Sequence, residues 1–263
     1  MSDLLYSEEF GKDKNPTFIC LHGLLGSSRN WRSVAKAIGE KFHVFALDLR
    51  NHGQSFHSDN SSITSISEDI LQWMEEKEIE NSIFCGHSLG GKVAMKIACD
   101  HPKQVNSLIV VDIAPRNYPK DHHIPTLDAL LGLDLPSIRT RKDADQELEV
   151  RVPNWAFRQF LLTNLGFNED GAFWIPNLLA LRSSIKDLSS NPLKECDRFE
   201  NPSLFVRGGR SGYVRGEHFE EILHYFPAAS IETIEDVGHD VHVENRPMFV
   251  QLVNSFLKKN FGD

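Results

Sequence analysis

The sequence predicts an α/β fold in which a mostly parallel sheet is covered by helices on both faces. Short apolar segments of strand length alternate with amphipathic segments of helical length between residues 17 and 112, and the alternation returns between residues 202 and 261. It is absent from the stretch between them. Because neither alternating part completes a sheet alone, we expect one core domain that carries an insertion, and 263 residues are enough to form it.

Each expected strand of the first part is an apolar run, and each expected helix has apolar residues at helical spacing. Ser28 opens the first helix, Ser65 or Ser67 can cap the second, and Pro102 ends the third. We expect strands at 17–21, 42–49, 82–86 and 105–112, and helices at 28–38, 65–79 and 89–102.

The insertion has a helical or irregular pattern, with helical segments such as NWAFRQFLLTNL and NLLALRSSI. We expect residues 115–190 to form a helical cap, while residues 1–114 and 191–263 form the core domain. In the second part of the core we expect strands at 202–208 and 230–236, and helices at 216–226 and 246–261.

The composition argues against several classes of protein. The formal net charge of −9 and the lack of a Lys/Arg-rich stripe argue against nucleic acid as a partner. No apolar stretch approaches the roughly 18 residues that a membrane-spanning helix needs, and the N-terminal segment lacks the pattern of a secretory signal. The four cysteines show no CxxC spacing, and three of them lie in apolar or helical segments. We therefore expect reduced thiols, no membrane partner and a cytoplasmic location.

The segment GHSLG at 86–90 carries the strongest chemical signal. It fits the pattern Gly-x-Ser-x-Gly and lies between an expected strand and an expected helix, which is the setting of a nucleophilic serine. Such a tight turn exposes the Ser88 hydroxyl, while Gly86 and Gly90 let the strand and the helix approach each other. The alternative is a glycine-rich turn with an incidental serine. We expect Ser88 to be a nucleophile.

Two backbone N–H groups are candidates for an oxyanion hole beside Ser88. Leu89 follows the serine at the N-terminus of the expected helix, where the backbone favours negative charge. The loop LHGLLGS at 21–27 can direct a second N–H group, that of Leu24, at the same space. We expect His22, in the same loop, to serve in loop packing rather than in catalysis.

His239 is the candidate general base. It follows Gly238, after the last expected strand and before the final helix. His242 is the neighbouring alternative, but its position favours packing at the start of that helix. His87 adjoins Ser88 and is expected to turn away from the hydroxyl. Because the histidine pairs of the chain lack other ligand-like residues nearby, we expect no metal and no cofactor.

These motifs together resemble the α/β-hydrolase superfamily. The resemblance covers nearly the whole chain and is carried by LHGLLGSSRNW, DLRNHGQS, GHSLGGKVAM, VVDIAP and VGHDVHVENRP. More narrowly, the chain is similar to the small bacterial carboxylesterases of the YbfF type and their eukaryotic relatives. The resemblance implies an α/β-hydrolase fold with an eight-stranded, mostly parallel sheet, a helical cap, and the chain order serine, acid, histidine.

The acid departs from the commoner superfamily pattern. Most members carry it in a loop that corresponds here to GGRSGYVRG, which contains no Asp or Glu and has Ser211 at the expected place. Asp112 ends the preceding strand, so it can reach His239 from the same edge of the sheet, and similar relatives are understood to use this earlier aspartate. Asp236 and Asp240 are the alternatives. The other interpretation of Asp112 is a turn residue.

The resulting hypothesis is a cofactor-free serine carboxylesterase that uses Ser88, His239 and Asp112 and forms an acyl-enzyme on small ester substrates. The resemblance implies short acyl chains. Alternatives on the same scaffold are a thioesterase, a C–C bond hydrolase or a lyase, and a non-catalytic ligand-binding protein is the rival from another class. The sequence leaves open the natural substrate, the cap aromatics that line the pocket, and the oligomeric state.

Overall fold

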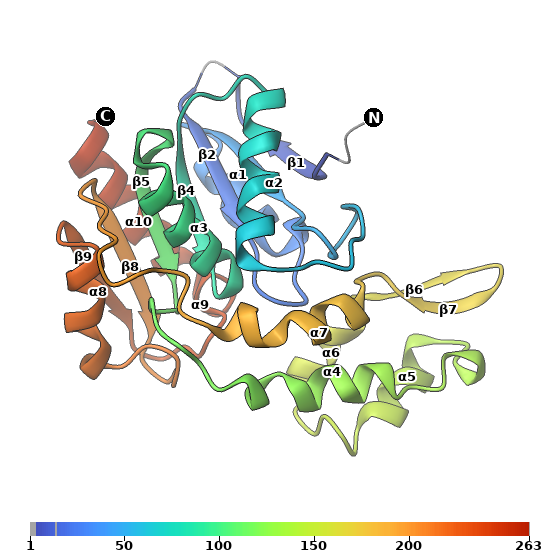
Figure 1. Cartoon of the computed structure of the whole chain (residues 1–263). Coiled ribbons are helices and arrows are strands. Elements are labelled where there is room, and N and C mark those ends of the chain that lie inside the picture. The colour runs from blue at the N-terminus through green and yellow to red at the C-terminus, as the bar shows by residue number, and fades with distance from the viewer. Residues whose placement is uncertain (1–3, 14, 263) are drawn as a thin grey trace.

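A computed structural model describes residues 4–13 and 15–262 of the chain. In this part the main sheet has seven strands in the order β1-β3-β2-β4-β5-β8-β9, and every neighbouring pair except β1–β3 is parallel (Figure 1). The strands are β1 (Ser7–Phe10), β2 (Thr17–Leu21), β3 (His43–Leu47), β4 (Ser82–His87), β5 (Val105–Val111), β8 (Ser203–Gly208) and β9 (Ala229–Ile234). The α/β fold class expected from the sequence is confirmed.

Helices cover both faces of the sheet, with α2 and α3 on one face and α1 and α10 on the other (Figure 1). The core helices are α1 (Arg32–Ile38), α2 (Ile63–Glu76), α3 (Leu89–Asp100), α8 (Phe219–Tyr225), α9 (Val241–Glu244) and α10 (Arg246–Phe261). The central strands β4 and β5 are buried almost throughout, which explains why their sequences are continuous apolar runs. Among the described residues no helix is long and apolar enough to span a membrane.

The helix α2 begins two residues earlier than the sequence pattern indicated. Its N-cap is Ser62, whose side chain accepts a hydrogen bond of 3.1 Å from the backbone N–H of Ser65. Capping by Ser65 or Ser67 was therefore the wrong expectation, because both residues already lie inside the helix. Several serines in this segment can serve as an N-cap by residue type alone. Which of them does so depends on where the backbone enters the helix, and the sequence pattern does not show this.

Among the described residues the main sheet has seven strands rather than the eight that the resemblance implied. The chain before β2 supplies the single antiparallel strand β1, which pairs with β3 at the edge of the sheet. The described residues before β1, from Leu4 to Tyr6, form no further strand. The sequence analysis also did not identify β1 itself, because its sequence SEEF is polar at three of four positions.

The insertion lies beyond the carboxyl ends of the parallel strands (Figure 1). It contains the helices α4 (Ile124–Leu131), α5 (Arg141–Leu148), α6 (Trp155–Leu162) and α7 (Leu178–Ser189), and an antiparallel hairpin of β6 (Leu165–Asn168) and β7 (Gly171–Trp174). The hairpin was not expected and extends away from the core (Figure 1). Near the two ends of the insertion, the backbone N–H of Tyr118 donates to the carbonyl of Ser189 at 2.8 Å, which holds these ends together.

Candidate active site

Ser88 occupies the tight turn between β4 and α3. Its φ of +51° lies in the left-handed region, which is strained for a residue with a side chain. Its backbone N–H donates to the carbonyl of Val111 at 3.0 Å, which ties the turn to the neighbouring strand. A Cβ on Gly86 would come within 2.3 Å of the Gly90 carbonyl, and one on Gly90 within 2.3 Å of the Leu21 carbonyl. The close approach of strand and helix thus requires both glycines.

Asp112 and His239 are brought together at the carboxyl ends of β5 and β9. The distance from His239 Nδ1 to Asp112 Oδ2 is 2.7 Å. The carboxylate is buried, and its other oxygen accepts a hydrogen bond of 3.0 Å from the backbone N–H of Gly208. The hydroxyl of Ser211 also donates to Asp112 Oδ2. Ser211 therefore occupies the position at which most members of the superfamily carry the acid. Its hydroxyl instead supports Asp112, which follows the preceding strand β5.

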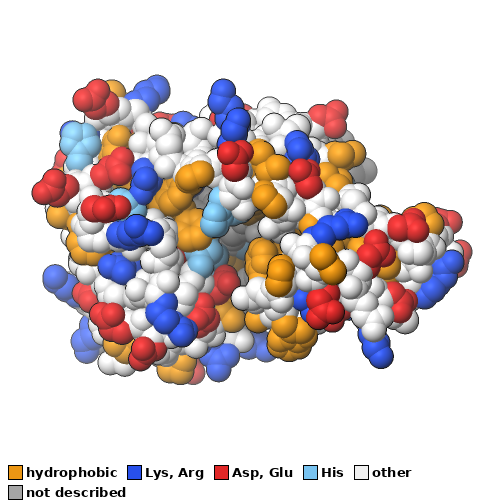
Figure 2. All heavy atoms as spheres, turned by 90° about the horizontal axis from the view of Figure 1, so that it is seen from below, with side chains coloured by type: hydrophobic (Ala, Val, Ile, Leu, Met, Phe, Trp, Pro, Cys, Tyr) orange, Lys and Arg blue, Asp and Glu red, His pale blue; other side chains and the backbone are white. Residues whose placement is uncertain are grey.

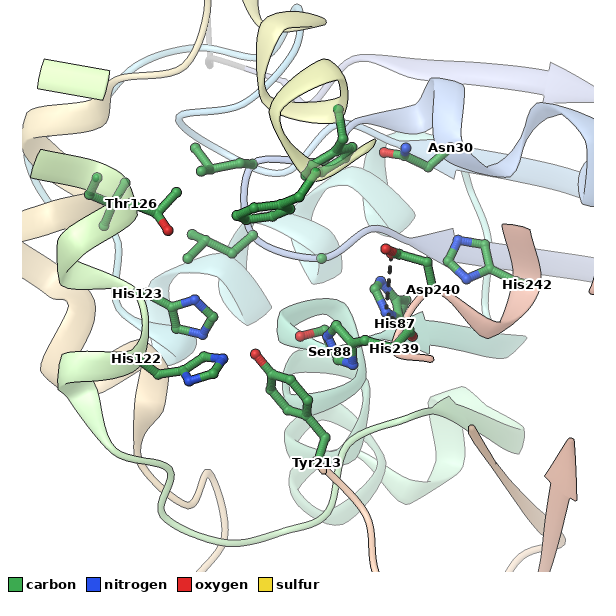
Figure 3. A pocket seen from close by; sticks show the side chains of 17 residues that line it. Asn30, His87, Ser88, His122, His123, Thr126, Tyr213, His239, Asp240 and His242 are labelled. Carbon is green, nitrogen blue, oxygen red and sulfur yellow. Dashed lines mark hydrogen bonds and ion pairs between the residues drawn. The ribbon is translucent and has the colours of Figure 1, made fainter. Parts of the chain in front are cut away.

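The two alternative acids do not contact the imidazole ring of His239. Asp236 is exposed, and no described residue forms an ion pair with it. Asp240 is also exposed, and its Oδ1 lies 3.9 Å from Nε2 of His87 (Figure 3). In the described structure, Asp112 is therefore the carboxylate that pairs with His239.

Ser88 and His239 both line a pocket of about 410 Å³. Figure 3 shows Ser88 and His239 on the core side of this pocket and His123 and Thr126, from the insertion, on the opposite side. Figure 2 shows histidine side chains beside a hollow on this face of the molecule, with hydrophobic side chains around it. The pocket thus lies between the sheet and the insertion, where an apolar ligand can reach the serine.

The backbone N–H groups of Leu24 and Leu89 have no hydrogen-bond acceptor among the described residues. Leu24 and Leu89 line a second, inner cavity of about 20 Å³ together with Ser88. Leu89 is the first residue of α3, so its N–H lies at the positive end of the helix. Two unpaired donors beside a serine that lines the pocket are the arrangement that stabilises an oxyanion.

Two buried histidines hold the loop that carries Leu24. Nε2 of His22 accepts a hydrogen bond of 3.0 Å from the N–H of Leu49, and Nε2 of His52 accepts one of 3.2 Å from the N–H of Leu25. Burial lowers the pKa of His22 to about 4 and that of His52 to about 3, so both rings are neutral near pH 7. The packing role expected for His22 is confirmed, and His52 is a second support that sequence reasoning missed.

Two further aromatic rings, those of His87 and Tyr213, contact His239. Nε2 of His87 donates to the backbone carbonyl of His239 at 3.0 Å, and the Tyr213 ring stacks on the His239 ring with centroids 3.8 Å apart. His242 is buried and stacks on Trp31 at 4.2 Å, as expected for a packing residue. No group of three or more His, Cys, Asp or Glu side chains in the described residues is arranged to hold a metal ion.

Comparisons with known proteins agree with the α/β fold of the chain. Residues 16–164 match a family model described as alpha/beta hydrolase fold. The chain is 35% identical to "sn-1-specific diacylglycerol lipase ABHD11" of Xenopus laevis over 97% of this chain and 84% of that protein. It is 34% identical to a "Putative esterase/lipase" of Haemophilus influenzae over 93% and 84% of the two chains. A solved structure described as "Marine microorganism esterase" superposes with a TM-score of 0.94 at 33% identity, covering 97% of this chain and all of that one.

Proposed function

The chain belongs to the α/β-hydrolase fold family, and from this premise we propose that it is a serine carboxylesterase that hydrolyses short-chain acyl esters. One observation carries the proposal: Ser88 lines the same pocket as His239, whose Nδ1 is hydrogen-bonded to Asp112. The relatives described as esterases and as a diacylglycerol lipase support ester hydrolysis.

In the proposed acylation step, Ser88 Oγ attacks the ester carbonyl while Nε2 of His239 removes its proton. Asp112 accepts the hydrogen bond from Nδ1–H of His239, which selects the required tautomer and stabilises the imidazolium. The N–H groups of Leu24 and Leu89 donate to the carbonyl oxygen as it becomes an oxyanion. One such donor contributes about 3 kcal/mol to transition-state stabilisation.

Deacylation repeats these roles with water. His239 first gives its proton to the leaving alcohol and then removes a proton from a water molecule, which attacks the acyl-enzyme. Ser88 is released when His239 returns the proton to it. The reaction therefore needs only these side chains and water, with no metal or organic cofactor.

We also propose that residues 115–190 act as a cap on a core made of residues 1–114 and 191–263. Side chains from α4 and α6 line the pocket opposite Ser88, which supports a role of the cap in substrate selection. All four cysteines are free thiols, which fits a reducing compartment such as the cytoplasm.

Active-site labelling tests the nucleophile directly. A fluorophosphonate probe should label the wild-type protein at Ser88, and Ser88→Ala should abolish labelling and reduce kcat on p-nitrophenyl acetate by roughly five to six orders of magnitude. Ser107→Ala is the matched control, because Ser107 is a buried serine near the start of β5. A fully active Ser88→Ala enzyme would exclude the mechanism.

A chain-length series of p-nitrophenyl esters beside acyl thioesters tests the substrate class. We expect the highest kcat/KM with short acyl esters. A higher kcat/KM for thioesters would favour the thioesterase alternative. Near-background rates across the series, despite labelling of Ser88, would favour a lyase or a ligand-binding protein.

A further inference from the structure

The ring of Tyr213 lies flat on the ring of His239. The two centroids are 3.8 Å apart and the ring planes are inclined by only 16°. Stacking uses the face of the His239 ring, whereas its nitrogens lie at the edge, where Nδ1 is 2.7 Å from Asp112 Oδ2. In the proposed mechanism His239 becomes an imidazolium in the transition state. The ring on its face therefore meets a positive charge.

The backbone of Tyr213 holds the ring in this position. Tyr213 lies in the loop after β8, which also carries Ser211. Its N–H donates to Ser211 Oγ at 3.1 Å, and its carbonyl accepts a hydrogen bond of 2.9 Å from the Tyr118 hydroxyl. The Ser211 hydroxyl in turn donates to Asp112. One hydrogen-bond network thus places both the carboxylate and the stacked ring against His239.

Tyr213 presents a neutral, electron-rich ring. Burial raises the pKa of its phenol to about 12, so the hydroxyl is protonated near pH 7. This hydroxyl points into the pocket (Figure 3), and no described residue forms a hydrogen bond with it. The face of an aromatic ring carries partial negative charge and attracts a cation within about 6 Å of its centre. The stacked ring therefore suits an imidazolium.

Three histidines from β4, the insertion and α9 also face His239: His87, His123 and His242. Burial lowers the pKa of His242 to about 3 and that of His123 to about 4. It also lowers the pKa of His87 well below its ordinary value. All three rings are therefore neutral near pH 7. The His87 ring is tilted by 49° to that of His239, with centroids 4.6 Å apart, so it does not stack on it.

Two carboxylates and a fourth histidine complete the surroundings. Asp112 pairs with the edge of the His239 ring, and Asp240 is exposed. His122 is also exposed, and its ring meets that of Tyr213 at 87° with centroids 5.5 Å apart. Among the described residues, Tyr213 is thus the aromatic side chain that stacks on the general base.

We propose that Tyr213 is a positioning residue that stabilises the protonated form of His239, because it holds the electron-rich face of its ring against the imidazolium. The inference rests on the proposed esterase function. Where the free enzyme has a neutral His239, loss of the stack destabilises only the transition state, so kcat/KM falls. Where the free enzyme is already protonated, the stack stabilises both states equally, and its loss leaves kcat/KM unchanged.

The test is the pH dependence of kcat/KM for p-nitrophenyl acetate, from acid to mildly alkaline pH. Tyr213→Phe keeps the ring, and Tyr213→Leu removes it. Pentafluorophenylalanine at position 213 keeps the shape of the ring but makes its face electron-poor. Phe160→Leu is the matched control, because Phe160 lines the same pocket but stacks on Phe157 rather than on His239.

We expect Tyr213→Phe to keep kcat/KM within about threefold of wild type at every pH, because the aromatic face remains. Tyr213→Leu and the pentafluorophenylalanine protein should lower the plateau of kcat/KM about tenfold and place the midpoint of its acid limb about one pH unit lower. Their rates should converge with that of the wild type at acid pH. Phe160→Leu should leave the midpoint unchanged, whatever its effect on KM.

A second measurement needs no activity. NMR titration of the His239 ring in Ser88→Ala, with and without Tyr213→Leu, should show the same lowering of the midpoint. The inference fails if Tyr213→Leu lowers the plateau without moving the midpoint, as loss of packing alone would. It also fails if the midpoint rises, as loss of shielding from water would cause. Retained fluorophosphonate labelling of Ser88 in either case would reject the stack and leave the esterase proposal standing.

Discussion

His239 Nδ1 lies 2.7 Å from Asp112 Oδ2, although 127 positions separate the two residues in the chain. The aspartate follows β5 and the histidine follows β9, with β8 between these strands in the sheet. The Asp112 side chain is fully buried, whereas the His239 side chain remains 26% exposed toward the pocket. One end of the ring is thus anchored while the other end stays available to a substrate.

Replacing Asp112 by Asn should reduce kcat for a short p-nitrophenyl ester by about four orders of magnitude, because an amide no longer selects the Nδ1–H tautomer of His239. Asp240→Asn is the control, since Asp240 is adjacent to His239 in sequence and lines the same pocket. We expect this control to stay within about threefold of wild type. An Asp112→Asn enzyme of normal kcat would show that another group orients the ring.

A second variant tests whether the carboxylate can act from position 211, after β8, instead of from position 112, after β5. The Ser211 hydroxyl already contacts Asp112 Oδ2 beside the His239 ring. The double variant Asp112→Asn/Ser211→Asp should therefore recover about 100-fold of the activity lost in Asp112→Asn. Ser211→Asp alone should be destabilised, because two carboxylates would face each other. If the double variant folds but its kcat is no higher than that of Asp112→Asn, a carboxylate at position 211 cannot replace Asp112.

The central elements of the fold were predictable because their signals are local. The apolar runs of β2, β4 and β5 and the apolar spacing of α10 identify them without a partner. The edge strand β1 is mostly polar, so only its pairing with β3 defines it. The hairpin of β6 and β7 likewise depends on cross-strand pairing, and its sequence favours a loop as much as a strand.

The site likewise has parts that local sequence predicts and parts that depend on contacts distant in sequence. The strained turn at Ser88 follows from five adjacent residues, and the pairing expected between Asp112 and His239 follows from the order of strands and the lack of an acid in the later loop. The supports of the site were missed because they act through backbone groups far away in sequence. Nε2 of His87 donates to the backbone carbonyl of His239, 152 positions away, and Nε2 of His52 accepts the N–H of Leu25, 27 positions away.

Gly86→Ala should destabilise the protein by about 3 kcal/mol, because its Cβ would meet the backbone of Gly90 and neither backbone can move without opening the turn. The midpoint of urea unfolding measures the loss. Gly216→Ala is the matched control, since a Cβ there has no atom within 4 Å and Gly216 is exposed. Equal unfolding midpoints for the two variants would mean that the close approach of β4 and α3 adds nothing to stability.

His52→Gln should make the protein less sensitive to acid. Burial lowers the pKa of His52 from its ordinary 6.5 to about 3. Between these pH values the unfolded chain binds the proton and the native ring does not, so the stability due to neutral His52 is complete above pH 6.5 and declines as the pH falls toward 3. The Gln side chain can still accept from Leu25 N–H but does not titrate. Between pH 7 and pH 5 the wild type should therefore lose about 2 kcal/mol more unfolding free energy than His52→Gln.

Urea titrations at both pH values measure these losses of unfolding free energy, with His101→Gln as the control at an exposed histidine. Identical losses in all three proteins would show that His52 is protonated in the native state.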